Sequence, residues 1–372
     1  MKYFIIAGEA SGDLHGASMV KHLRRIDADA VIEGWGGDKM AAQGVELHKH
    51  IRDLAFMGFV EVLMNIGTIL KNFRLCKEQI TAFDPDVVVL VDYPGFNLRM
   101  AKWAKGKGFK TLYYISPTVW AWKESRVEIV KKYVDRMICI LPFEKDFYVK
   151  HGYEKANYVG HPSVEQVDEA RSLLPKQENT EKLIVLLPGS RVQEVKKMLP
   201  VMLKSVESYS DYSVAIAQAP NLPASVYAAI LEESDVRVSL LQHQTYDLLH
   251  RASLALVTSG TATLETALFG VPQVVCYIAH PLSYWIAKRL VKVKYISLVN
   301  LILDRLVVQE LIQHDMTVEK LRSEIDRLLY DKDYRDSVAA SYTELRQVLR
   351  EKGVSEAVAG KVYELAQELR SV

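Results

Sequence analysis

The sequence predicts an α/β protein made of two doubly wound domains that face each other across a cleft. Three observations lead to this fold class. Short apolar, β-branched runs alternate with helical patterns along the chain, which is typical of parallel sheets covered by helices. This alternation stops over a polar stretch at residues 168–182 and then restarts. The chain has 372 residues, which exceeds a typical ~150-residue domain more than twofold, and 49% of them are hydrophobic.

The N-terminal domain is expected to span residues 1–167. Its six expected strands are short apolar runs, several of them followed by glycine: residues 3–7, 31–35, 87–91, 111–115, 136–141 and 158–159. Residues 168–182 are charged, contain Pro175 and offer only Leu173 and Leu174 as sizeable apolar side chains. We interpret this stretch as the linker between the domains.

The C-terminal domain is expected to span residues 183–345. Its five expected strands again alternate with helical segments: residues 183–187, 213–217, 236–239, 254–257 and 273–277. Residues 346–372 read as a surface helix because apolar side chains recur at helical spacing on a polar background. The sequence leaves open whether this helix packs back on the N-terminal domain.

Charge and cysteine content narrow the class of protein. Lys and Arg total 47 against 46 Asp and Glu, so the net charge of +1 does not favour a nucleic-acid partner. The three cysteines lie far apart in the sequence, which argues against a disulfide framework or a structural zinc site and favours a reducing compartment. The longest apolar runs have six residues, whereas a bilayer span needs about 20. We therefore expect a cytoplasmic protein that does not cross a membrane.

Polar residues follow two expected strands of the N-terminal domain. Gly8-Glu9-Ala10-Ser11-Gly12-Asp13 comes directly after the first strand and leads into a helix. Asp92 ends the strand at 87–91, at the edge where parallel sheets bind ligands, and is the leading candidate for a general base. The alternative is that these residues only cap helices.

Two strand-to-helix turns of the C-terminal domain suit a diphosphate. Gly189, Ser190 and Arg191 follow its first strand, and Ser190 with Gln193 is expected to form a capping box. An arginine at a helix start favours an anionic partner. The second turn, Ser259-Gly260-Thr261, offers hydroxyl and amide donors, and Glu265 one turn later can accept ribose hydroxyls. The alternative is a pair of ordinary capped helices. Neither domain has the glycine spacing of a nicotinamide-dinucleotide site or a phosphate-binding Gly-Lys-Ser/Thr loop.

Two further stretches differ from an ordinary surface. Residues 55–73 are apolar nearly all round, which indicates either burial or contact with apolar ligand or lipid. Residues 284–295 interleave aromatic and basic side chains, as helices at a membrane surface do, although a solvated basic face is the commoner explanation. His48 and His50 lack further ligands at metal-binding spacing and are taken as surface residues.

Several motifs together resemble the lipid-A-disaccharide synthase family. They are Gly-Glu-Ala-Ser-Gly-Asp at 8–13, Ser-Pro-Thr-Val-Trp-Ala-Trp at 116–122, Leu-Pro-Phe-Glu-Lys at 141–145, Gly-His-Pro at 160–162, Leu-Pro-Gly-Ser-Arg at 187–191 and Ser-Gly-Thr-Ala-Thr-Leu-Glu at 259–265. The resemblance runs from residue 3 to about residue 313. It implies a GT-B glycosyltransferase of lipid A and lipopolysaccharide biosynthesis in a Gram-negative bacterium. Such an enzyme joins UDP-2,3-diacylglucosamine to 2,3-diacylglucosamine 1-phosphate (lipid X), inverts the anomeric centre and releases UDP, without a metal or cofactor.

The resemblance also assigns roles to residues. Catalytic candidates are Asp92, Glu9, Asp13 and Arg191. Donor-binding candidates are Gly189, Ser190, Arg191, Ser259, Gly260, Thr261, Glu265, Asn300, Gln309 and Glu310. Acceptor and acyl-binding candidates are Gly12, Phe56, Met57, Phe59, Val60, Leu63 and Met64. Where the family pattern has a second acid after the strand, this chain has Gly95.

The resemblance implies a protein bound peripherally to the inner membrane surface, and a homodimer is compatible with it. Two other functions remain open from the sequence. One is a non-hydrolysing UDP-sugar 2-epimerase of the same fold, which would bury residues 55–73 as core. The other is a non-catalytic binding module at the membrane surface.

Overall fold

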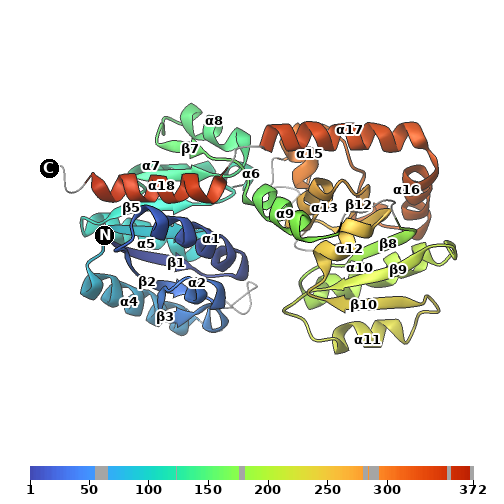
Figure 1. Ribbon diagram of the computed structural model, residues 1–372, viewed down its shortest axis with the longest axis horizontal. Helices are drawn as coiled ribbons and strands as arrows, with labels where there is room; N and C mark the ends of the chain where they lie inside the picture. Colours follow the sequence, from blue (N-terminus) through green and yellow to red (C-terminus); the bar gives the residue numbers. More distant parts are fainter. Residues whose placement is uncertain are drawn as a thin grey trace. The chain divides into compact units, whose positions relative to one another are not determined.

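The computed structural model describes residues 1–54, 66–122, 124–175, 181–279, 284, 293–349 and 353–368 (Figure 1). The chain divides into two compact units, each with its own sheet and core. The first comprises Met1–Pro162 together with Glu351–Val372, and the second comprises Ser163–Arg350. The fold is therefore α/β with two Rossmann-like parallel sheets, as the sequence predicts.

The first unit is built on a seven-stranded parallel sheet, in the order β3-β2-β1-β4-β5-β6-β7 within the described residues. Its strands are β1 (Lys2–Ala7), β2 (Val31–Gly36), β3 (Glu46–His50), β4 (Val87–Val91), β5 (Lys110–Tyr114), β6 (Arg136–Cys139) and β7 (Ala156–Tyr158). Its helices are α1 (Ala10–Ile26), α2 (Asp38–Ala42), α4 (Ile66–Phe83), α5 (Pro94–Gly106), α6 (Val119–Trp122), α7 (Val127–Tyr133), α8 (Pro142–Lys150) and α18 (Val354–Gln367). Two short 3₁₀ turns lie at Ile51–Asp53 and Glu124–Arg126.

The second unit repeats this architecture with a six-stranded sheet, in the order β10-β9-β8-β11-β12-β13. Its strands are β8 (Leu183–Leu187), β9 (Ser213–Gln218), β10 (Val238–Gln242), β11 (Leu254–Thr258), β12 (Gln273–Tyr277) and β13 (Glu310–Ile312). Its helices are α9 (Pro162–Leu173), α10 (Val192–Val206), α11 (Ser225–Leu231), α12 (Thr245–Arg251), α13 (Thr261–Phe269), α15 (Leu298–Leu303), α16 (Val318–Tyr330) and α17 (Lys332–Leu349), with a 3₁₀ turn at Gln313–Asp315. Every pair of neighbouring strands is parallel.

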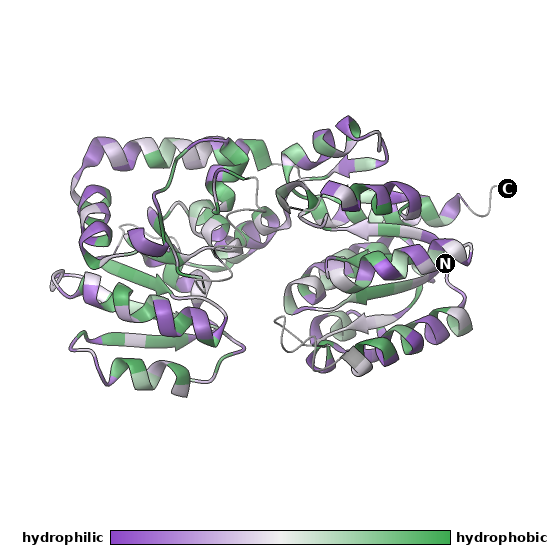
Figure 2. Ribbon diagram, turned by 180° about the vertical axis from the view of Figure 1, so that it is seen from behind, coloured by the Kyte–Doolittle hydropathy of each residue, from purple (hydrophilic) through white to green (hydrophobic). Residues whose placement is uncertain are grey.

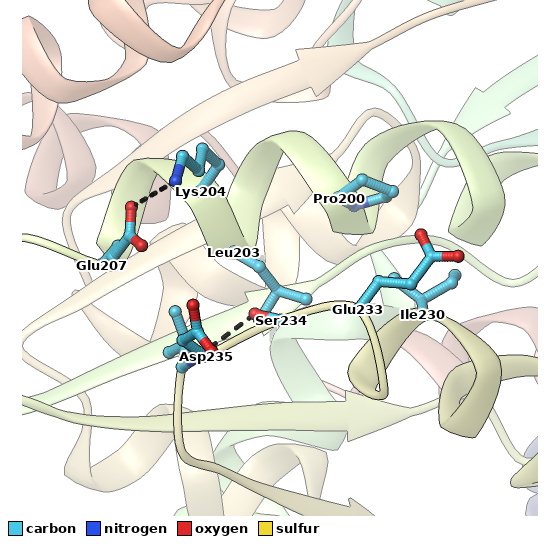
Figure 3. Close-up of a pocket in the computed structure, with 9 residues that line it drawn as sticks. Pro200, Leu203, Lys204, Glu207, Ile230, Glu233, Ser234 and Asp235 are labelled. Carbon is cyan, nitrogen blue, oxygen red and sulfur yellow. Dashed lines mark hydrogen bonds and ion pairs between the residues drawn. The ribbon is translucent and has the colours of Figure 1, made fainter.

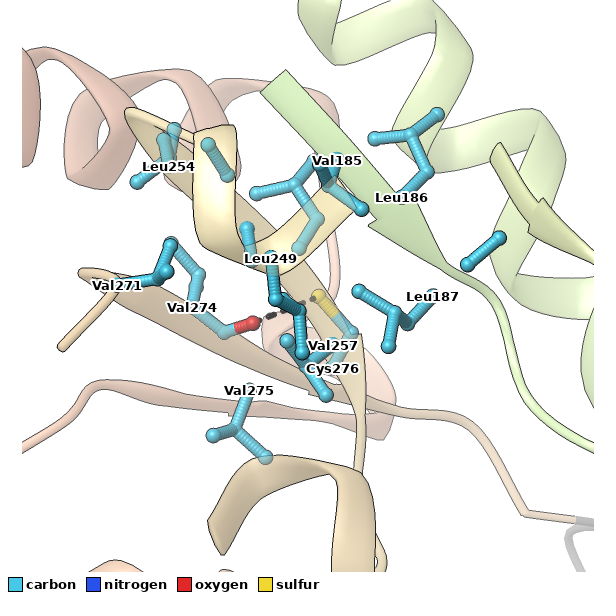
Figure 4. Close-up of a cluster of buried hydrophobic side chains, with 14 of the residues drawn as sticks. Val185, Leu186, Leu187, Leu249, Leu254, Val257, Val271, Val274, Val275 and Cys276 are labelled. Atoms are coloured by element: carbon cyan, nitrogen blue, oxygen red, sulfur yellow. Dashed lines mark hydrogen bonds between the residues drawn. The ribbon is translucent and has the colours of Figure 1, made fainter. Parts of the chain in front are cut away.

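Continuous burial explains why the central strands read as uninterrupted apolar runs. All five residues of β4 and all five of β8 are buried, because helices cover both faces of each sheet. In the second unit, side chains from β8, β11 and β12 interdigitate in one cluster (Figure 4). Figure 2 shows several strands of both sheets in hydrophobic colours, whereas α17 carries a mixture of hydrophobic and hydrophilic residues.

The C-terminal helix α18 belongs to the first unit. Its apolar residues Val354, Val358 and Val362 are fully or almost fully buried in the same cluster as strands β1, β4 and β5. At its polar edge, the Arg136 guanidinium of β6 contacts the carboxylates of Glu364 and Glu368, both at 2.8 Å. The first unit is thus assembled from two separate stretches of sequence.

Each sheet has one point at which the strand order reverses. In the first unit this point lies between β1 and β4, where Ala7 is paired with Val91. In the second unit it lies between β8 and β11, where Leu187 is paired with Val257. Open parallel sheets bind ligands outside the carboxyl ends of the strands at such points. The turns after β1, β4, β8 and β11 are therefore the places to look for sites.

The structure differs from the sequence-based expectation in three places. The polar strand β3 and the three-residue strand β13 were not predicted, because neither has a sustained apolar pattern. The expected linker at 168–182 is partly helical: α9 runs to Leu173, and Val164 and Val167 are buried in the core of the second unit. The boundary between units lies instead at Pro162–Ser163. Among the described helices, none combines the length and hydrophobicity that a bilayer span requires.

Candidate functional site

Asp92 lies directly after β4 in a conformation that is rare for its residue type. Its φ is +48°, and Tyr93 follows at +50°, so two successive non-glycine residues occupy the left-handed region. The Asp92 carbonyl accepts hydrogen bonds from the Asn97 amide at 2.8 Å and the Tyr113 hydroxyl at 2.7 Å. The Asp92 N–H donates to the Tyr114 carbonyl at 2.9 Å. Such over-determined backbone strain is typical of functional sites.

The Asp92 side chain has the electrostatics of a general base. Burial raises the pKa of its carboxyl to about 6, the Glu9 charge adds to this effect, and a hydrogen bond with the Tyr93 backbone opposes it. A base whose pKa lies near the working pH is well matched to proton transfer. The candidate that the sequence predicts is thus placed in a suitable environment.

Glu9 reaches the same region from the turn after β1. It occupies the N-cap position of α1, but its side chain makes no capping hydrogen bond. Its charge raises the pKa of both Asp92 and Tyr93. Gly8 makes room for this arrangement, because a Cβ at Gly8 would lie 2.3 Å from the Tyr93 ring. The turns after β1 and β4 therefore form one acidic cluster, Glu9 and Asp92, at the reversal point of the first sheet.

Asp13, another predicted catalytic residue, has a structural role. Its carboxylate is 3% exposed and accepts from the backbone N–H groups of Gly37 at 2.7 Å, Met40 at 3.0 Å and Lys39 at 3.1 Å. These groups belong to the start of α2, so Asp13 of α1 caps a different helix. Gly12 is also buried, with its Cα facing Ala7 and the Val91 carbonyl.

Phe56, Met57, Phe59, Val60, Leu63 and Met64 lie outside the described residues, as does most of the basic aromatic stretch at 284–295.

In the second unit, most of the predicted donor residues line one cavity of about 390 Å³. It lies at the reversal point between β8 and β11. Seven of its lining residues are predicted donor-binding residues: Gly189, Ser190, Arg191, Ser259, Gly260, Thr261 and Glu265. Two polar turns that are about 70 residues apart in sequence are thereby brought to the same wall.

The first turn is shaped by Glu194, which the sequence analysis missed. Its carboxylate accepts from the N–H groups of Ser190 at 3.1 Å and Arg191 at 3.2 Å, and it pairs with the Arg191 guanidinium at 3.0 Å. The expected capping box of Ser190 and Gln193 is therefore wrong, since Arg191 is the N-cap and Glu194 the acid three residues later. Gly189 has φ +115°, and a Cβ there would lie 2.6 Å from Glu194. The Arg191 side chain is 65% exposed, so an anion in the cavity can reach its guanidinium in competition with Glu194.

The second turn opens onto α13. Gly260 is the N-cap of this helix, and a Cβ there would meet nothing within 4 Å, so the backbone is accessible. Gly260, Thr261 and Ala262 at the helix start line the cavity, where the helix dipole places its positive end. Glu265 lies on the cavity wall, where burial raises the pKa of its carboxyl and a hydrogen bond from Tyr246 opposes that rise. This wall offers donors for phosphate oxygens and an acceptor for hydroxyl groups.

Three weaker donor candidates lie outside this cavity lining. Asn300 is fully buried, and its side-chain amide donates a hydrogen bond to the Glu310 carboxylate at 2.9 Å. The same carboxylate accepts from the backbone N–H groups of Ile296 at 3.0 Å and Ser297 at 2.9 Å. The Ile296 carbonyl in turn accepts from the Ser259 hydroxyl at 2.9 Å. Asn300 and Glu310 therefore support the Ser259 turn indirectly, through the backbone of Ile296. Gln309 contributes its carbonyl to β12 through the Val275 N–H.

Other features of the described residues carry none of the predicted roles. A cavity of about 130 Å³ between α10 and the end of α11 holds the Lys204–Glu207 ion pair and is lined by no predicted site residue (Figure 3). His48 and His50 pair with Glu33 at 2.6 Å and Asp38 at 3.3 Å. Among the described residues, no group of three or more His, Cys, Asp or Glu side chains is arranged to hold a metal.

The chain is similar to known proteins in family, sequence and fold. The model of a family described as "Lipid-A-disaccharide synthetase" matches residues 3–360. A lipid-A-disaccharide synthase of Geobacter sulfurreducens is 38% identical over 358 residues, covering 94% of this chain and 93% of its own. One from Myxococcus xanthus is 39% identical over 357 residues, covering 93% and 92%.

Solved structures with the same fold are more distant in sequence. The UDP-GlcNAc 2-epimerase of Neisseria meningitidis, bound to UDP-GlcNAc, matches with a TM-score of 0.66 at 13% identity, over 98% of this chain and 100% of its own. The glycosyltransferase of kitacinnamycin matches with a TM-score of 0.63 at 14% identity, over 98% of both chains. At this identity the likeness concerns the fold alone, which epimerases and GT-B glycosyltransferases share.

Proposed function

The chain belongs to the lipid-A-disaccharide synthetase family, and from this premise we propose which of its residues carry the reaction. As a member of that family it is a hexosyltransferase of lipid A biosynthesis. We propose that the second unit binds UDP-2,3-diacylglucosamine and the first binds 2,3-diacylglucosamine 1-phosphate. The convergence of seven predicted donor residues on one cavity carries this assignment.

The donor site suits a leaving diphosphate. Arg191 and the N-terminus of α13 offer positive charge and N–H donors where negative charge develops on UDP. Arg191 pairs with Glu194 at 3.0 Å, so the diphosphate would compete for the guanidinium. Glu265 is placed to accept ribose hydroxyls from the cavity wall.

The acceptor side needs a base. Asp92 removes the proton of the attacking hydroxyl, the oxygen forms a bond to the anomeric carbon, and the bond to UDP breaks with inversion. We assign this role to Asp92 rather than Asp13, whose carboxylate already accepts three backbone hydrogen bonds. Glu9 raises the pKa of Asp92 and so makes it the stronger base.

The decisive experiment measures UDP release from UDP-2,3-diacylglucosamine in detergent micelles, with and without the 1-phosphate acceptor. We expect release that depends on acceptor and falls about 100-fold in kcat/KM in Arg191→Ala. Arg305→Ala is the matched control, because this arginine of the second unit pairs with Glu344 on the surface. Release without acceptor dependence would contradict the proposal, and formation of a 2-epimer from UDP-N-acetylglucosamine would then be tested.

We propose further that the first unit binds an anionic membrane surface. Exposed basic side chains gather on α4 and α5, where a surface depression of about 380 Å³ is lined by Lys77, Arg99, Lys102, Trp103, Gly106 and Lys107. No acid is among these lining residues. Leu70, on the same helix as Lys77, is 60% exposed. Such basic and aromatic surfaces favour lipid headgroups.

Sedimentation with vesicles containing phosphatidylglycerol tests the membrane proposal. Each basic residue near an anionic surface contributes about 1 kcal/mol, so Arg99→Ser/Lys102→Ser should weaken binding roughly 30-fold at low salt. Lys332→Ser/Arg335→Ser on α17 removes the same charge elsewhere and should bind as the wild type does. Equal losses in the two double variants would show that only net charge matters.

A further inference from the structure

The loop after β5 is held by a buried carboxylate whose contacts exceed the needs of a helix cap. Glu144, on α8, is 1% exposed. One of its carboxylate oxygens accepts from the backbone N–H groups of Ile140 at 3.2 Å and Leu141 at 3.1 Å, which caps α8. The other oxygen accepts from the Trp120 indole N–H at 3.0 Å, 24 residues earlier in the chain.

Placing a carboxylate here is unfavourable by itself. Burial raises the pKa of Glu144 to about 7, although hydrogen bonds from Trp120, Ser116 and two backbone groups oppose the rise. In a capping box the glutamate at the third helical position reaches back to the N-cap N–H, here that of Leu141, and needs no donor from elsewhere in the chain. The contact with the Trp120 loop is therefore the feature that distinguishes Glu144 from an ordinary cap.

Trp120 is fixed on two sides. Its indole N–H donates to Glu144, and its ring meets Phe143 edge-on, with ring centroids 4.8 Å apart and an interplanar angle of 87°. Ser116, at the start of the same loop, is linked to the Tyr148 hydroxyl at 2.9 Å. The Trp120 side chain is nevertheless only partly buried. A rigid, partly accessible indole is suited to anchor an amphipathic ligand.

The Trp120 loop starts beside the proposed base. The Asp92 N–H donates to Tyr114, the last residue of β5, and the Tyr113 hydroxyl donates to the Asp92 carbonyl. The next residue, Ile115, has φ +67°, which is strongly disfavoured for a β-branched side chain. The ends of β4 and β5 are thus both strained and tied together, as expected where geometry serves a site.

We propose that Trp120 contacts the acceptor and that Glu144 is the positioning residue that fixes it. This inference rests on the proposed function and adds to it an acceptor-side wall formed by residues 115–120, which lead from β5 into α6. Glu144 acts through Trp120 and has no role in the chemical step. The predicted acceptor is the amphipathic lipid-linked sugar, which offers both a sugar ring and acyl chains to an indole.

Steady-state kinetics with separate variation of donor and acceptor test the proposal. Trp120→Phe removes the indole N–H and leaves a smaller aromatic ring. Glu144→Gln replaces the accepting carboxylate by a neutral amide. We expect each to raise the acceptor KM about tenfold and to leave the donor KM within twofold of wild type. The double variant should be no worse than the more impaired single variant, because both changes break one contact.

Trp35→Phe is the matched control. Its indole N–H is also bonded to a side chain of the same unit, Gln79, at 2.7 Å, but on β2. We expect lower stability in this variant and an unchanged acceptor KM. If Glu144→Gln does not fold, Trp120→Phe alone still decides, since it leaves the cap of α8 intact.

The outcomes separate the two proposals. An unchanged acceptor KM in Trp120→Phe, or equal rises in both KM values, would overturn the inference while the transferase function stands. Additive effects in the double variant would refute the positioning role of Glu144. Absence of acceptor-dependent UDP release in the wild type would instead overturn the proposed function itself.

Discussion

Asp92 carries its carboxyl group on a backbone that Asn97 and Tyr113 hold in the left-handed region. Removing the carboxylate charge as Asp92→Asn leaves this frame in place and abolishes the base. We expect kcat/KM to fall by about 10²–10⁴. The measurement is acceptor-dependent UDP release at saturating donor.

The pH dependence of the wild type provides the control for this variant. A base must be deprotonated, so kcat/KM should rise with pH through about 6, the pKa of the Asp92 carboxyl, and level off above it. Asp92→Asn should lose this acid limb. Retention of the limb in the residual activity would transfer the role to Glu9.

At this scale the sequence locates the site better than it explains individual residues. Strand-end position alone picks out Asp92, Arg191 and Glu265, because parallel sheets bind ligands at that edge. It does not reveal that Asp13 caps another helix or that Glu194 shapes the Arg191 turn. Both depend on which backbone groups come within hydrogen-bonding distance after folding.

Among the elements, α1 and α2 depend on each other through Asp13. Three N–H groups at the start of α2 donate to its carboxylate, Gly37 and Met40 to one oxygen and Lys39 to the other. In Asp13→Asn the amide oxygen can accept from the first two, but the amide nitrogen faces the Lys39 N–H, a donor that it cannot satisfy. We expect the variant to lose about 2 kcal/mol or more of unfolding free energy. Urea titration monitored by circular dichroism measures this loss.

Activity distinguishes the capping role of Asp13 from a catalytic one. The exposed Asp29→Asn of the same unit is the comparison and should leave stability within about 0.5 kcal/mol of wild type. In Asp13→Asn, turnover by the folded fraction should fall less than tenfold. A collapse of turnover at unchanged stability would show that the carboxylate acts on the substrate instead.

Element boundaries show where pattern reading reaches its limit. The buried strands β4, β8 and β12 were predicted to the residue or nearly so, since uninterrupted β-branched runs have few other solutions. The edge strand β3 was missed because Glu46–His50 is polar and only partly buried. The expected linker was placed too late because α9 is charged on its exposed face and buries few residues.

Across the whole molecule, buried ionisable groups set opposing trends of stability with pH. Burial lowers the pKa of His15 to about 4 and of His161 to about 3, so their contribution is full above pH 6.5 and is lost as pH falls. The raised pKa values of Asp92 and Glu144 act in the other direction, since their contribution is present at low pH and is lost as pH rises through about 6 to 7.

The variant His161→Gln isolates the contribution of one histidine to the pH dependence of stability. The difference in unfolding free energy between wild type and variant should shrink as pH falls below 6.5, with a slope approaching about 1.4 kcal/mol per pH unit. Urea titrations of both proteins between pH 4.5 and 7.5 measure it. A pH-independent difference would mean that His161 is not kept neutral by its surroundings.

The alternation of strands and helices and the number of units follow from the sequence, but the assignment of α18 to the first unit does not. Its apolar spacing shows which face is buried, whereas the partner depends on contacts with β1 and α1, more than 300 residues earlier.

That assignment has a consequence for synthesis on the ribosome. Helix α18 covers a hydrophobic face of the first unit, and it cannot do so until all of Ser163–Arg350 has been translated. At ~5–20 residues per second this leaves the nascent unit incomplete for roughly 10–40 s. The second unit is contiguous and can fold first, while the face that α18 will cover stays exposed on the earlier one. Translation order and folding order are therefore expected to be reversed in this chain.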